Sequence, residues 1–314
     1  MALTTASNPT PYGPTLHTDR WRLITGFDLP GHRQMALDEA LLESVIRGGA
    51  PVVRLYTWRP ATLSLGVNQP IASVDRAACR ERGFGLVRRI TGGRAVLHQH
   101  ELTYAVIAPR SDPRVSGGVI ESYRKISAAL VRGLRVLGAD VALAEPDAAL
   151  VRRIARAHLR HNGEGAGGAR STPEGAGGEP EYGAVCFDVA TAYELTAGGR
   201  KLVGSAQARR GDALLQHGSI LLDIDFDAWT AVFTYEHEQA RRQAAHKLPA
   251  RMTSLRQELG RTVTPAEVCT ALSRAFEEEF AISLELATLS AHEEAEALRL
   301  ATTKYATEAW TARM

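Results

Sequence analysis

The chain has 314 residues, which is enough to bury one large hydrophobic core or two modest ones. Its composition, 45% hydrophobic and 23% charged, is typical of a globular protein, and no apolar run is long enough to span a membrane. A net charge of +2 gives no reason to expect a nucleic-acid or membrane partner. Three cysteines, Cys79, Cys186 and Cys269, form no CxxC pair, so we expect a cytoplasmic protein with neither disulfides nor a metal site.

The predicted domain follows a leader. Residues 1–20 lack the charged start and the apolar core of a signal peptide, so we expect a flexible leader and then a single domain over 21–314. Gly48 and Gly138 are placed to end two long helices. In order, the first half of the domain is predicted to contain a helix over 34–47, strands over 52–58 and 61–67, a short helix over 73–83, strands over 85–90 and 102–108, and a helix over 122–138.

The composition changes after this last helix. Residues 163–183 are rich in glycine, contain Pro173 and Pro180, and carry few apolar groups. Such a segment cannot bury enough surface to offset the entropy that is lost on ordering. We therefore predict a mobile insertion at about 160–183, which is either a flap beside a site or an ordinary surface loop.

A hairpin is predicted to follow the insertion. Strand-like segments over 192–196 and 201–208 flank Gly198 and Gly199, and adjacent glycines suit the positive φ angles of a tight turn. Helices alternate with antiparallel-type strands, which predicts an α+β domain around one sheet. The remaining predicted elements are a strand over 213–224 and helices over 227–238, 264–280 and 292–306.

The segment RRITGGRAVLHQH over 88–100 concentrates residues that bind anions. Adjacent glycines let the backbone approach a ligand closely, and arginines hold carboxylate, phosphate or carbonyl oxygens through forked hydrogen bonds. No Gly-Lys-Ser/Thr follows, so the segment is not a phosphate-binding P-loop. Two interpretations stay open, a ligand site and a plain turn followed by a histidine at a strand end. The candidate residues are Arg88, Arg89, Gly92, Gly93, Arg94 and His98.

Cys186 and Lys201 form a candidate reactive pair. By residue type alone, Cys186 is a buried core residue and Lys201 is an exposed strand residue. A nearby ammonium group would lower the pKa of a thiol from its usual value of about 8.5 and would pass a proton to or from a leaving group. The spacing makes their meeting easy, since one loop and one strand separate them.

Alternation along the second hairpin strand divides its residues between two faces. Lys201 and Ser205 are predicted to share one face, and Gly204 lies on the other, where the missing side chain leaves room. The next strand adds Gln216 and His217, for which hydrogen bonding within the structure is favoured over a place in the site.

Several segments, taken together and in order, resemble the biotin/lipoate protein ligase superfamily. Within it, the chain is most similar to the cysteine-dependent octanoyltransferases of the type found in Gram-positive bacteria. The resemblance implies a fold like that of class II aminoacyl-tRNA synthetases and biotin ligases, with a mostly antiparallel sheet and flanking helices. The matching segments are QMALDEALL, LYTWRPATLSLGVNQ, VRRITGGRAVLHQHELTYAVI, CFD, YEL, GRKLVGSAQAR, LLQHGSILLDID and TKYATEAW.

The resemblance also implies an activity in lipoate biosynthesis. Octanoyl would arrive as a thioester on acyl carrier protein, pass to Cys186, and then pass to a lysine of a lipoyl carrier domain such as the glycine-cleavage H protein. Lys201 would assist proton transfer. No ATP or other cofactor is implied, because transfer from one thioester to another is nearly neutral and transfer to an amide is downhill. The residues implied to bind acyl group and substrate are Arg89, Gly92, Gly93, Arg94, His98, Gly204 and Ser205.

Three other functions stay open at this point. An ATP-dependent lipoate ligase shares Lys201, although the family's ligases usually have a third glycine at the position of Arg94 and do not require Cys186. An amidotransferase of the same fold would move octanoyl between carrier domains, and a non-catalytic relative would only bind it. The chain also departs from the transferase pattern at Val189, where the family often has proline or serine.

Overall fold

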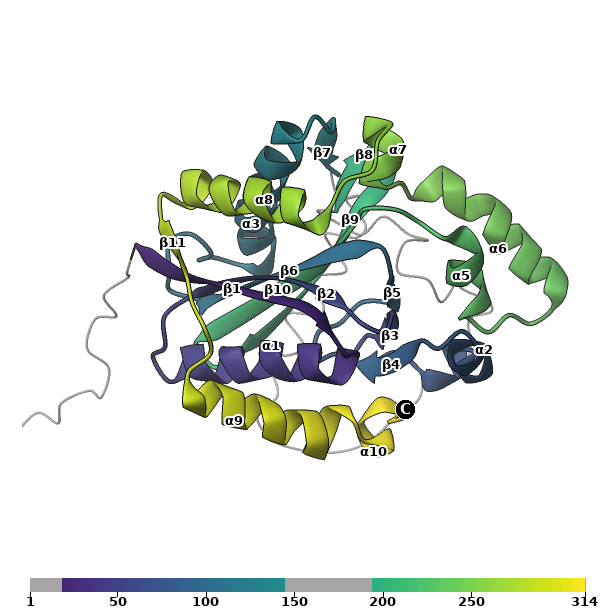
Figure 1. The fold of residues 1–314 in the computed structure, drawn as a ribbon, viewed down its shortest axis with the longest axis horizontal. Coiled ribbons are helices and arrows are strands. Elements are labelled where there is room, and N and C mark those ends of the chain that lie inside the picture. The colour runs from purple at the N-terminus through teal and green to yellow at the C-terminus, as the bar shows by residue number, and fades with distance from the viewer. Residues whose placement is uncertain (1–18, 145–193, 314) are drawn as a thin grey trace, which may run out of the picture.

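The structure is a computed structural model that describes residues 19–144 and 194–313. Most of the predicted leader, the predicted insertion and Cys186 lie outside these described residues. Figure 1 shows the arrangement of the elements. The strands are β1 (Arg20–Leu29), β2 (Val52–Trp58), β3 (Thr62–Leu65), β4 (Gly85–Arg88), β5 (Val96–His98), β6 (Glu101–Pro109), β7 (Val141–Leu143), β8 (Leu195–Ala197), β9 (Arg200–Arg210), β10 (Ala213–Leu221) and β11 (Ser283–Leu286). The α-helices are α1 (Gly31–Ile46), α2 (Arg76–Glu81), α3 (Val119–Val136), α5 (Phe226–Ala231), α6 (Glu238–Arg251), α7 (Leu255–Leu259), α8 (Pro265–Phe280), α9 (Ala291–Leu300) and α10 (Glu308–Thr311).

Eight of these strands form one sheet, in the order β11-β1-β2-β6-β10-β9-β8-β7. β1 pairs in parallel with β11 and β2, and the other neighbouring strands pair antiparallel. The prediction of an α+β fold with a mostly antiparallel sheet is therefore confirmed. A second, three-stranded sheet in the order β4-β3-β5 stands beside the main one.

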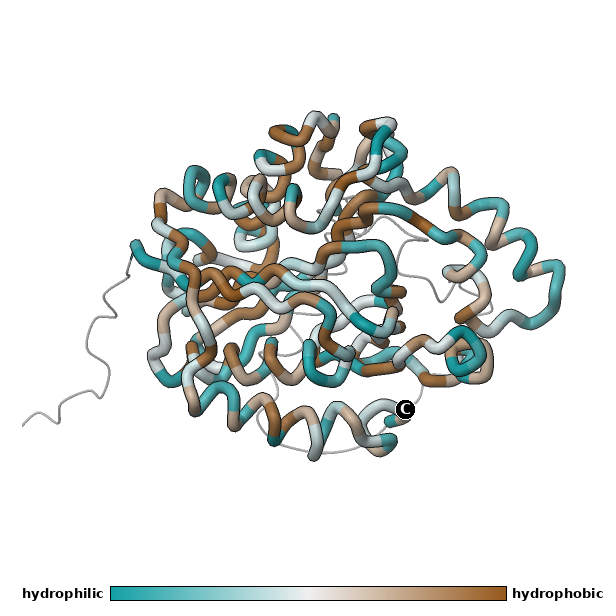
Figure 2. The backbone as a smooth tube through the Cα atoms, in the orientation of Figure 1, coloured by the Kyte–Doolittle hydropathy of each residue, from teal (hydrophilic) through white to brown (hydrophobic). Residues whose placement is uncertain are grey.

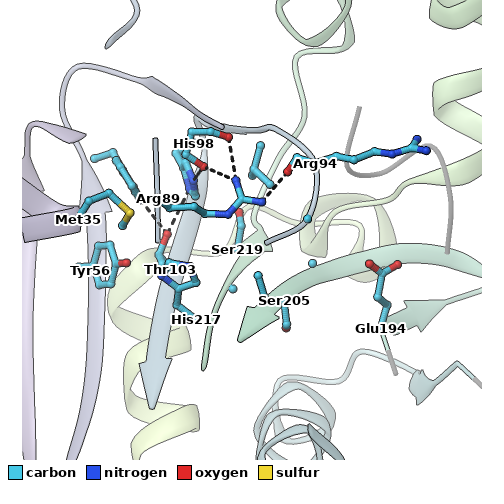
Figure 3. Close-up of a pocket in the computed structure, with 17 residues that line it drawn as sticks. Met35, Tyr56, Arg89, Arg94, His98, Thr103, Glu194, Ser205, His217 and Ser219 are labelled. Carbon is cyan, nitrogen blue, oxygen red and sulfur yellow. Dashed lines mark hydrogen bonds between the residues drawn. The ribbon is translucent and has the colours of Figure 1, made fainter. Parts of the chain in front are cut away.

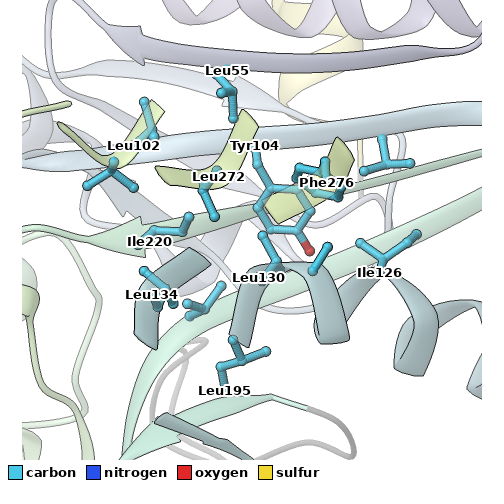
Figure 4. Close-up of a cluster of buried hydrophobic side chains, with 14 of the residues drawn as sticks. Leu55, Leu102, Tyr104, Ile126, Leu130, Leu134, Leu195, Ile220, Leu272 and Phe276 are labelled. Atoms are coloured by element: carbon cyan, nitrogen blue, oxygen red, sulfur yellow. The ribbon is translucent and has the colours of Figure 1, made fainter. Parts of the chain in front are cut away.

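Helices cover both faces of the main sheet (Figure 1). α3 and α8 pack on one face, where the buried residues include Tyr104, Leu130, Leu134, Leu272 and Phe276 (Figure 4). α1, α9 and the C-terminal segment cover the other face. Each fully buried leucine stabilises the fold by about 1.5–3 kcal/mol relative to an exposed one. Figure 2 shows the apolar strands at the centre of the molecule and the largely polar α6 at its edge.

Local sequence signals account for where several helices begin. Thr264 and Glu267 form a capping box at the start of α8, with Pro265 in the first turn, as the sequence predicts. Glu121 reaches back to the backbone N–H of Gly118, so α3 begins three residues before the predicted start at 122. Each cap satisfies backbone N–H groups that have no partner inside the helix.

The predicted helix over 227–238 is confirmed only in its first part, and its continuation beyond residue 231 is wrong. α5 ends at Ala231, and α6 begins at Glu238. Phe233 between them forms a bridge with Val74, which draws the chain into an extended conformation. β11 is a further strand that the sequence patterns above leave unassigned: it has only four residues, three of them exposed, and Leu284 alone packs against the core from within it.

The hairpin of β8 and β9 contains a bulge that alters the predicted faces. Gly198 and Gly199 both have positive φ angles, 54° and 73°, as a tight turn requires. Leu195 pairs with Val203, but Thr196 pairs with Lys201, so β9 holds one extra residue at this point. The prediction that Lys201 shares a face with Ser205 is therefore wrong, because Lys201 pairs opposite Thr196, on the face that carries Gly204.

Gly133 brings α3 close to α8. A Cβ at this position would lie 2.8 Å from Leu272 Cδ2 and 3.2 Å from Ala275 Cβ. We expect Gly133→Val to force the two helices apart and to lower the free energy of unfolding by about 1–3 kcal/mol, measured by urea denaturation. Val136→Ala, an exposed change on the same helix, is the control and should stay within about 0.5 kcal/mol. Equal stability of the Gly133 variant and the wild type would contradict this account of the packing.

Candidate active site

A cavity of about 130 Å³ lies between the main sheet and the second sheet (Figure 3). Its floor is the main-sheet face that carries Thr103 of β6, His217 and Ser219 of β10, and Gly204 of β9. The second sheet and the loop after β4 form its roof. The remaining lining residues are Met35, Tyr56, Trp58, Ser64, Arg89, Gly93, Arg94, Val96, His98, Glu194, Ser205, Ala206 and Gly218. A mostly apolar cavity with a few polar groups is the usual form of a small-ligand site.

Arg89 holds the roof loop in place. Its guanidinium donates to the carbonyl oxygens of Gly92 (2.8 Å) and Arg94 (2.7 Å), and also to the carbonyl oxygen of Ser64 (2.9 Å). Nε donates to Thr91 Oγ1 at 3.1 Å. Arg89 therefore borders the cavity, but these donors point into the loop and stabilise it.

Thr91 connects the loop to the protein core through His217 and Asp38. Because Thr91 Oγ1 accepts from Arg89, its own hydrogen can donate to His217 Nε2, 2.7 Å away. His217 Nδ1 then carries the proton and donates to Asp38 Oδ2 at 2.8 Å. Asp38 Oδ1 accepts from Arg54 at 2.6 Å. The two alternatives predicted for His217 both hold: it forms hydrogen bonds within the protein, and it lines the cavity.

The Asp38 carboxylate is charged although it is 1% exposed. Burial by itself raises the pKa of Asp38, but Arg54, His217 and Tyr56 together hold this pKa below its ordinary value. Tyr56 OH donates to Asp38 at 2.8 Å, and its own pKa lies well above the usual value because the phenol is buried beside a carboxylate. Each buried charge thus has a partner, which is what makes such burial tolerable.

His98 lies at the end of β5 and is stacked on Trp58, with 3.9 Å between ring centroids. Its Nε2 lies 2.9 Å from Ser64 Oγ, and its Nδ1 lies 3.5 Å from a carboxylate oxygen of Glu101. Burial lowers the pKa of His98 more than Glu101 raises it, so the imidazole is neutral at pH 7. A neutral, stacked histidine forms a flat wall of the cavity.

Lys201 and Glu194 form a buried ion pair at the opposite rim. Their side chains are 2% and 3% exposed, and the ammonium of Lys201 donates to Glu194 Oε1. The carbonyl of Lys201 accepts from the backbone N–H of Thr253 at 2.9 Å, which fixes the start of β9. Glu194 lines the cavity, so the pair brings a cation to its edge.

The other predicted site residues lie around the same cavity in different roles. Gly93 adopts a φ of 86°, a conformation that favours glycine, and both it and Gly204 line the cavity. Gly92 contributes the carbonyl that Arg89 holds. Ser205 borders the cavity, but its hydroxyl lies 2.7 Å from Tyr104 OH on the other face of the sheet. Figure 3 shows Arg94 on the side of the cavity where Glu194 lies.

Arg88, a further anion-binding candidate, does not contact the cavity. It is fully buried, and its guanidinium donates to the carbonyl oxygens of Gly66, Gln69 and Thr311. These bonds tie the C-terminal segment to the loop after β3. The arginine-rich motif therefore holds the walls of the site together from within, rather than presenting several guanidinium groups to an anion.

Cys186 lies outside the described residues, so its distance from Lys201 is not defined. The described thiols, Cys79 and Cys269, do not line the cavity. Burial raises the pKa of each to about 11, which keeps both protonated at neutral pH. At Cys79 the effect of the nearby Arg80 is outweighed by burial and by Asp75.

Sequence reasoning missed several residues that line the cavity or hold its lining, and three of them carry the arguments below. Glu194 stands in the quoted segment YEL, and Asp38 in QMALDEALL, but nothing in a single sequence pairs them with Lys201 and His217. Ser219 stands in LLQHGSILLDID. Its position two residues after His217 on one strand is the signal that both face the same way.

Comparison with known proteins assigns the family. Residues 30–277 match the lipoyl protein ligase A/B catalytic domain. The chain belongs to this family. It is 38% identical over 292 residues to an octanoyltransferase LipM of Geobacillus kaustophilus, covering 92% of this chain and 97% of that one. It is 37% identical over 295 residues to an octanoyltransferase LipM of Staphylococcus aureus, covering 93% and 98%.

Solved members of the lipoyl protein ligase family share the fold. A bipartite lipoate protein ligase from Thermoplasma acidophilum superposes with a TM-score of 0.72 at 25% identity, over 93% of this chain and 96% of that one. A lipoate-protein ligase A bound with ATP gives 0.69 at 26% identity, over 93% and 98%. The predicted superfamily and the predicted class of enzyme, the acyltransferases, are confirmed. In the described ranges, none of the helices is both long and apolar enough to cross a bilayer.

Asp38→Asn should make the free energy of unfolding less dependent on pH in the acidic range. A depressed pKa in the folded state means that the carboxylate stabilises the protein above its unfolded pKa of about 4, and that this stabilisation is lost as the pH falls through the folded value. At pH 7 the variant should lose about 3–5 kcal/mol, because Arg54 is left buried without its anion.

The measurement is urea denaturation at pH 7 and pH 3. The free energy of unfolding should change less with pH in Asp38→Asn than in the wild type. Asp28→Asn is the control, since Asp28 is exposed and its pair with Arg59 is 3.6 Å long. The same loss on acidification in wild type and Asp38→Asn would contradict the assignment.

Proposed function

We propose that the chain transfers an octanoyl group from octanoyl-acyl carrier protein to a lysine of a lipoyl carrier domain, through a thioester on Cys186. The glycine-cleavage H protein is a suitable acceptor. The observation that carries the proposal is the full-length similarity to proteins named octanoyltransferase LipM, at 36–40% identity over most of both chains. A cytoplasmic location follows from the same proposal, since a catalytic thiol must stay reduced.

The cavity suits the hydrocarbon part of such a substrate. Met35, Trp58, Val96 and Ala206 supply apolar walls, and Gly204 leaves the floor open beside the β9–β10 pair. A saturated acyl chain needs no hydrogen bonds along its length, so burial of its methylene groups is the main attraction, at about 0.8 kcal/mol for each one. The Lys201–Glu194 pair then lies at the rim, where the reactive end of the acyl group would be.

The proposed reaction has two half-reactions. First, the Cys186 thiolate attacks the carbonyl carbon of the donor thioester, a new C–S bond forms, and the carrier thiolate leaves and takes up a proton. Second, the ε-amine of the acceptor lysine attacks the same carbon and loses a proton, an amide bond forms, and the Cys186 thiolate is released. No bond in either step requires ATP, because the acyl group arrives already activated.

Lys201 assists both half-reactions in this proposal. Its ammonium stabilises the Cys186 thiolate and exchanges protons with the leaving thiol and the attacking amine. Glu194 keeps the ammonium at the rim and balances its charge, which would otherwise be costly in a buried position. Cys186 precedes Glu194 by eight residues in the sequence (186 to 194).

An ATP-dependent lipoate ligase is the second candidate, because a ligase with ATP bound shares the fold at 26% identity. Such an enzyme would modify an acceptor from free octanoate and ATP and would not depend on Cys186. An amidotransferase would instead require an octanoylated lipoyl domain as donor. A binding protein without activity would show no turnover with any donor.

Cys186→Ser decides between these functions. The protein is incubated with octanoyl-acyl carrier protein without ATP, and its intact mass is measured. We expect the wild type to gain the mass of one octanoyl group and the variant to form no thioester adduct. Cys79→Ser and Cys269→Ser are matched controls and should keep the adduct, since both thiols lie away from the cavity. Transfer by Cys186→Ser at the wild-type rate would sink the proposal, and modification only with ATP and free octanoate would favour the ligase.

Lys201→Met should slow both half-reactions by about 10²–10⁴-fold. The variant removes the cation that stabilises the Cys186 thiolate and the group that exchanges protons with the leaving thiol and the attacking amine. It also leaves Glu194 buried without a partner and should lower stability. The double variant Lys201→Met, Glu194→Leu removes both charges, so its stability should recover while its activity does not. Lys247→Ala, on the exposed face of α6, is the control. Single-turnover rates and urea denaturation provide the readouts; a double variant with wild-type activity would refute the role.

A further inference from the structure

Ser219 has a buried hydroxyl that the protein does not use. It is 1% exposed, and its Oγ has no hydrogen-bond partner among the residues that the structure describes. A buried hydroxyl without a partner destabilises the protein relative to one that is satisfied, because its interaction with water is lost and not replaced. Such a group in a native protein calls for an explanation, and a ligand is one when the group faces a cavity.

Ser219 does face the cavity of the candidate active site. On β10 it pairs with Gly204 of β9 on one side and with Thr103 of β6 on the other, and all three line the cavity. Figure 3 shows its side chain among those that surround this space. The adjacent Gly204 has no side chain, so a ligand atom above it can come within reach of Ser219 Oγ.

The other hydroxyls of the cavity are already engaged. Tyr56 donates to Asp38, Thr103 donates to Glu101, and Ser205 is bonded to Tyr104. Ser64 lies 2.9 Å from His98 Nε2 and also accepts from Arg89. Within the described lining, Ser219 is therefore the hydroxyl that remains available to a ligand.

The chemistry of the proposed substrate selects the atom that Ser219 would bind. An octanoyl thioester has a hydrocarbon chain and one strong hydrogen-bond acceptor, the carbonyl oxygen. We propose that Ser219 Oγ–H donates to this oxygen, and that it stabilises the negative charge that develops there when the Cys186 thiolate or the acceptor amine attacks. This inference rests on the proposed function. It makes Ser219 a catalytic residue and places the reactive end of the acyl group above Gly204, on the strand that also carries Lys201.

Ser219→Ala tests the inference. Loss of one donor to a developing oxyanion should lower the rate constant of acyl-enzyme formation by about 10²–10³-fold, with little change in KM. The free energy of unfolding should stay the same or rise, because the variant removes an unpaired buried hydroxyl. Ser127→Ala is the matched control: Ser127 Oγ is also buried without a partner among the described residues, but it lies in α3, away from the cavity. This control should keep wild-type activity.

A spectroscopic readout separates catalysis from structure. The wild-type octanoyl-enzyme is prepared with a ¹³C label at the carbonyl. In its infrared spectrum, the C=O stretch should have a lower wavenumber than that of the same labelled octanoyl thioester in an aprotic solvent, because a hydrogen bond weakens the C=O bond. In Ser219→Ala the wavenumber of this band should rise towards the value in the aprotic solvent. An unshifted wild-type band would overturn the inference without any variant.

Further outcomes are equally decisive. Acylation of Ser219→Ala at the wild-type rate would overturn the role of the hydroxyl. A marked loss of stability in this variant would show that the hydroxyl is already paired within the protein, and would overturn it as well. If the wild type itself takes up no octanoyl group, the proposed function fails and the inference fails with it; if the wild type is acylated and only the Ser219 results disagree, the proposed function stands.

Discussion

The site depends on the burial of one guanidinium group, that of Arg89, beneath a loop of main-chain carbonyls. Its donors hold Gly92 and Arg94, and Thr91 passes the connection to His217, Asp38 and then Arg54. A buried cation must satisfy its donors, and here the oxygens that satisfy it belong to the roof of the cavity. The position of the roof is therefore set by electrostatics deep in the main sheet, through contacts that join α1, β2, β10 and the loop after β4.

A different device positions the opposite rim. One extra residue in β9 rotates Lys201 onto the cavity face, while the strand continues into the sheet with normal pairing from Val203 onward. Glu194, at the beginning of the hairpin, then meets the ammonium. The catalytic cation we propose is thus fixed by backbone pairing and by a buried carboxylate. The roof is held by an arginine whose donors bond to main-chain carbonyl and hydroxyl oxygens, and the rim by a lysine that pairs with the carboxylate of Glu194.

Between the roof and the rim, the main sheet forms the floor of the cavity. Along β10, residues that face the cavity alternate with residues that face the hydrophobic core on the other side of the sheet. His217 and Ser219 face the cavity, whereas Gln216 faces Tyr104 and α3 on the other side. Gly218, between them, could not carry a side chain, because its Cβ would lie 2.6 Å from Tyr104 Cε1 and 2.7 Å from Ser205 Oγ. The floor is flat and polar at isolated points, which suits an acyl group with one polar end.

Candidate site residues can be grouped from the sequence because their motifs lie along strands, where neighbours in sequence remain neighbours in space. The Gly92–Gly93 loop, His98, Gly204 and Ser205 are all found at one cavity. Their roles were harder to predict. Arginines at a glycine turn suggest anion binding, but Arg88 and Arg89 are used internally, because the loops around them leave carbonyls that need donors.

The family, the α+β class, most of the long helices and the candidate reactive segments can be inferred from the sequence, since these depend on local pattern and on combinations of motifs. Which groups meet depends on the folded chain. Asp38 and His217 are far apart along the chain, and so are Thr91 and His217, and no local pattern specifies such contacts. The bulge at Lys201 and the unpaired hydroxyl of Ser219 belong to the same class, because strand register and the satisfaction of buried polar groups are properties of the folded sheet.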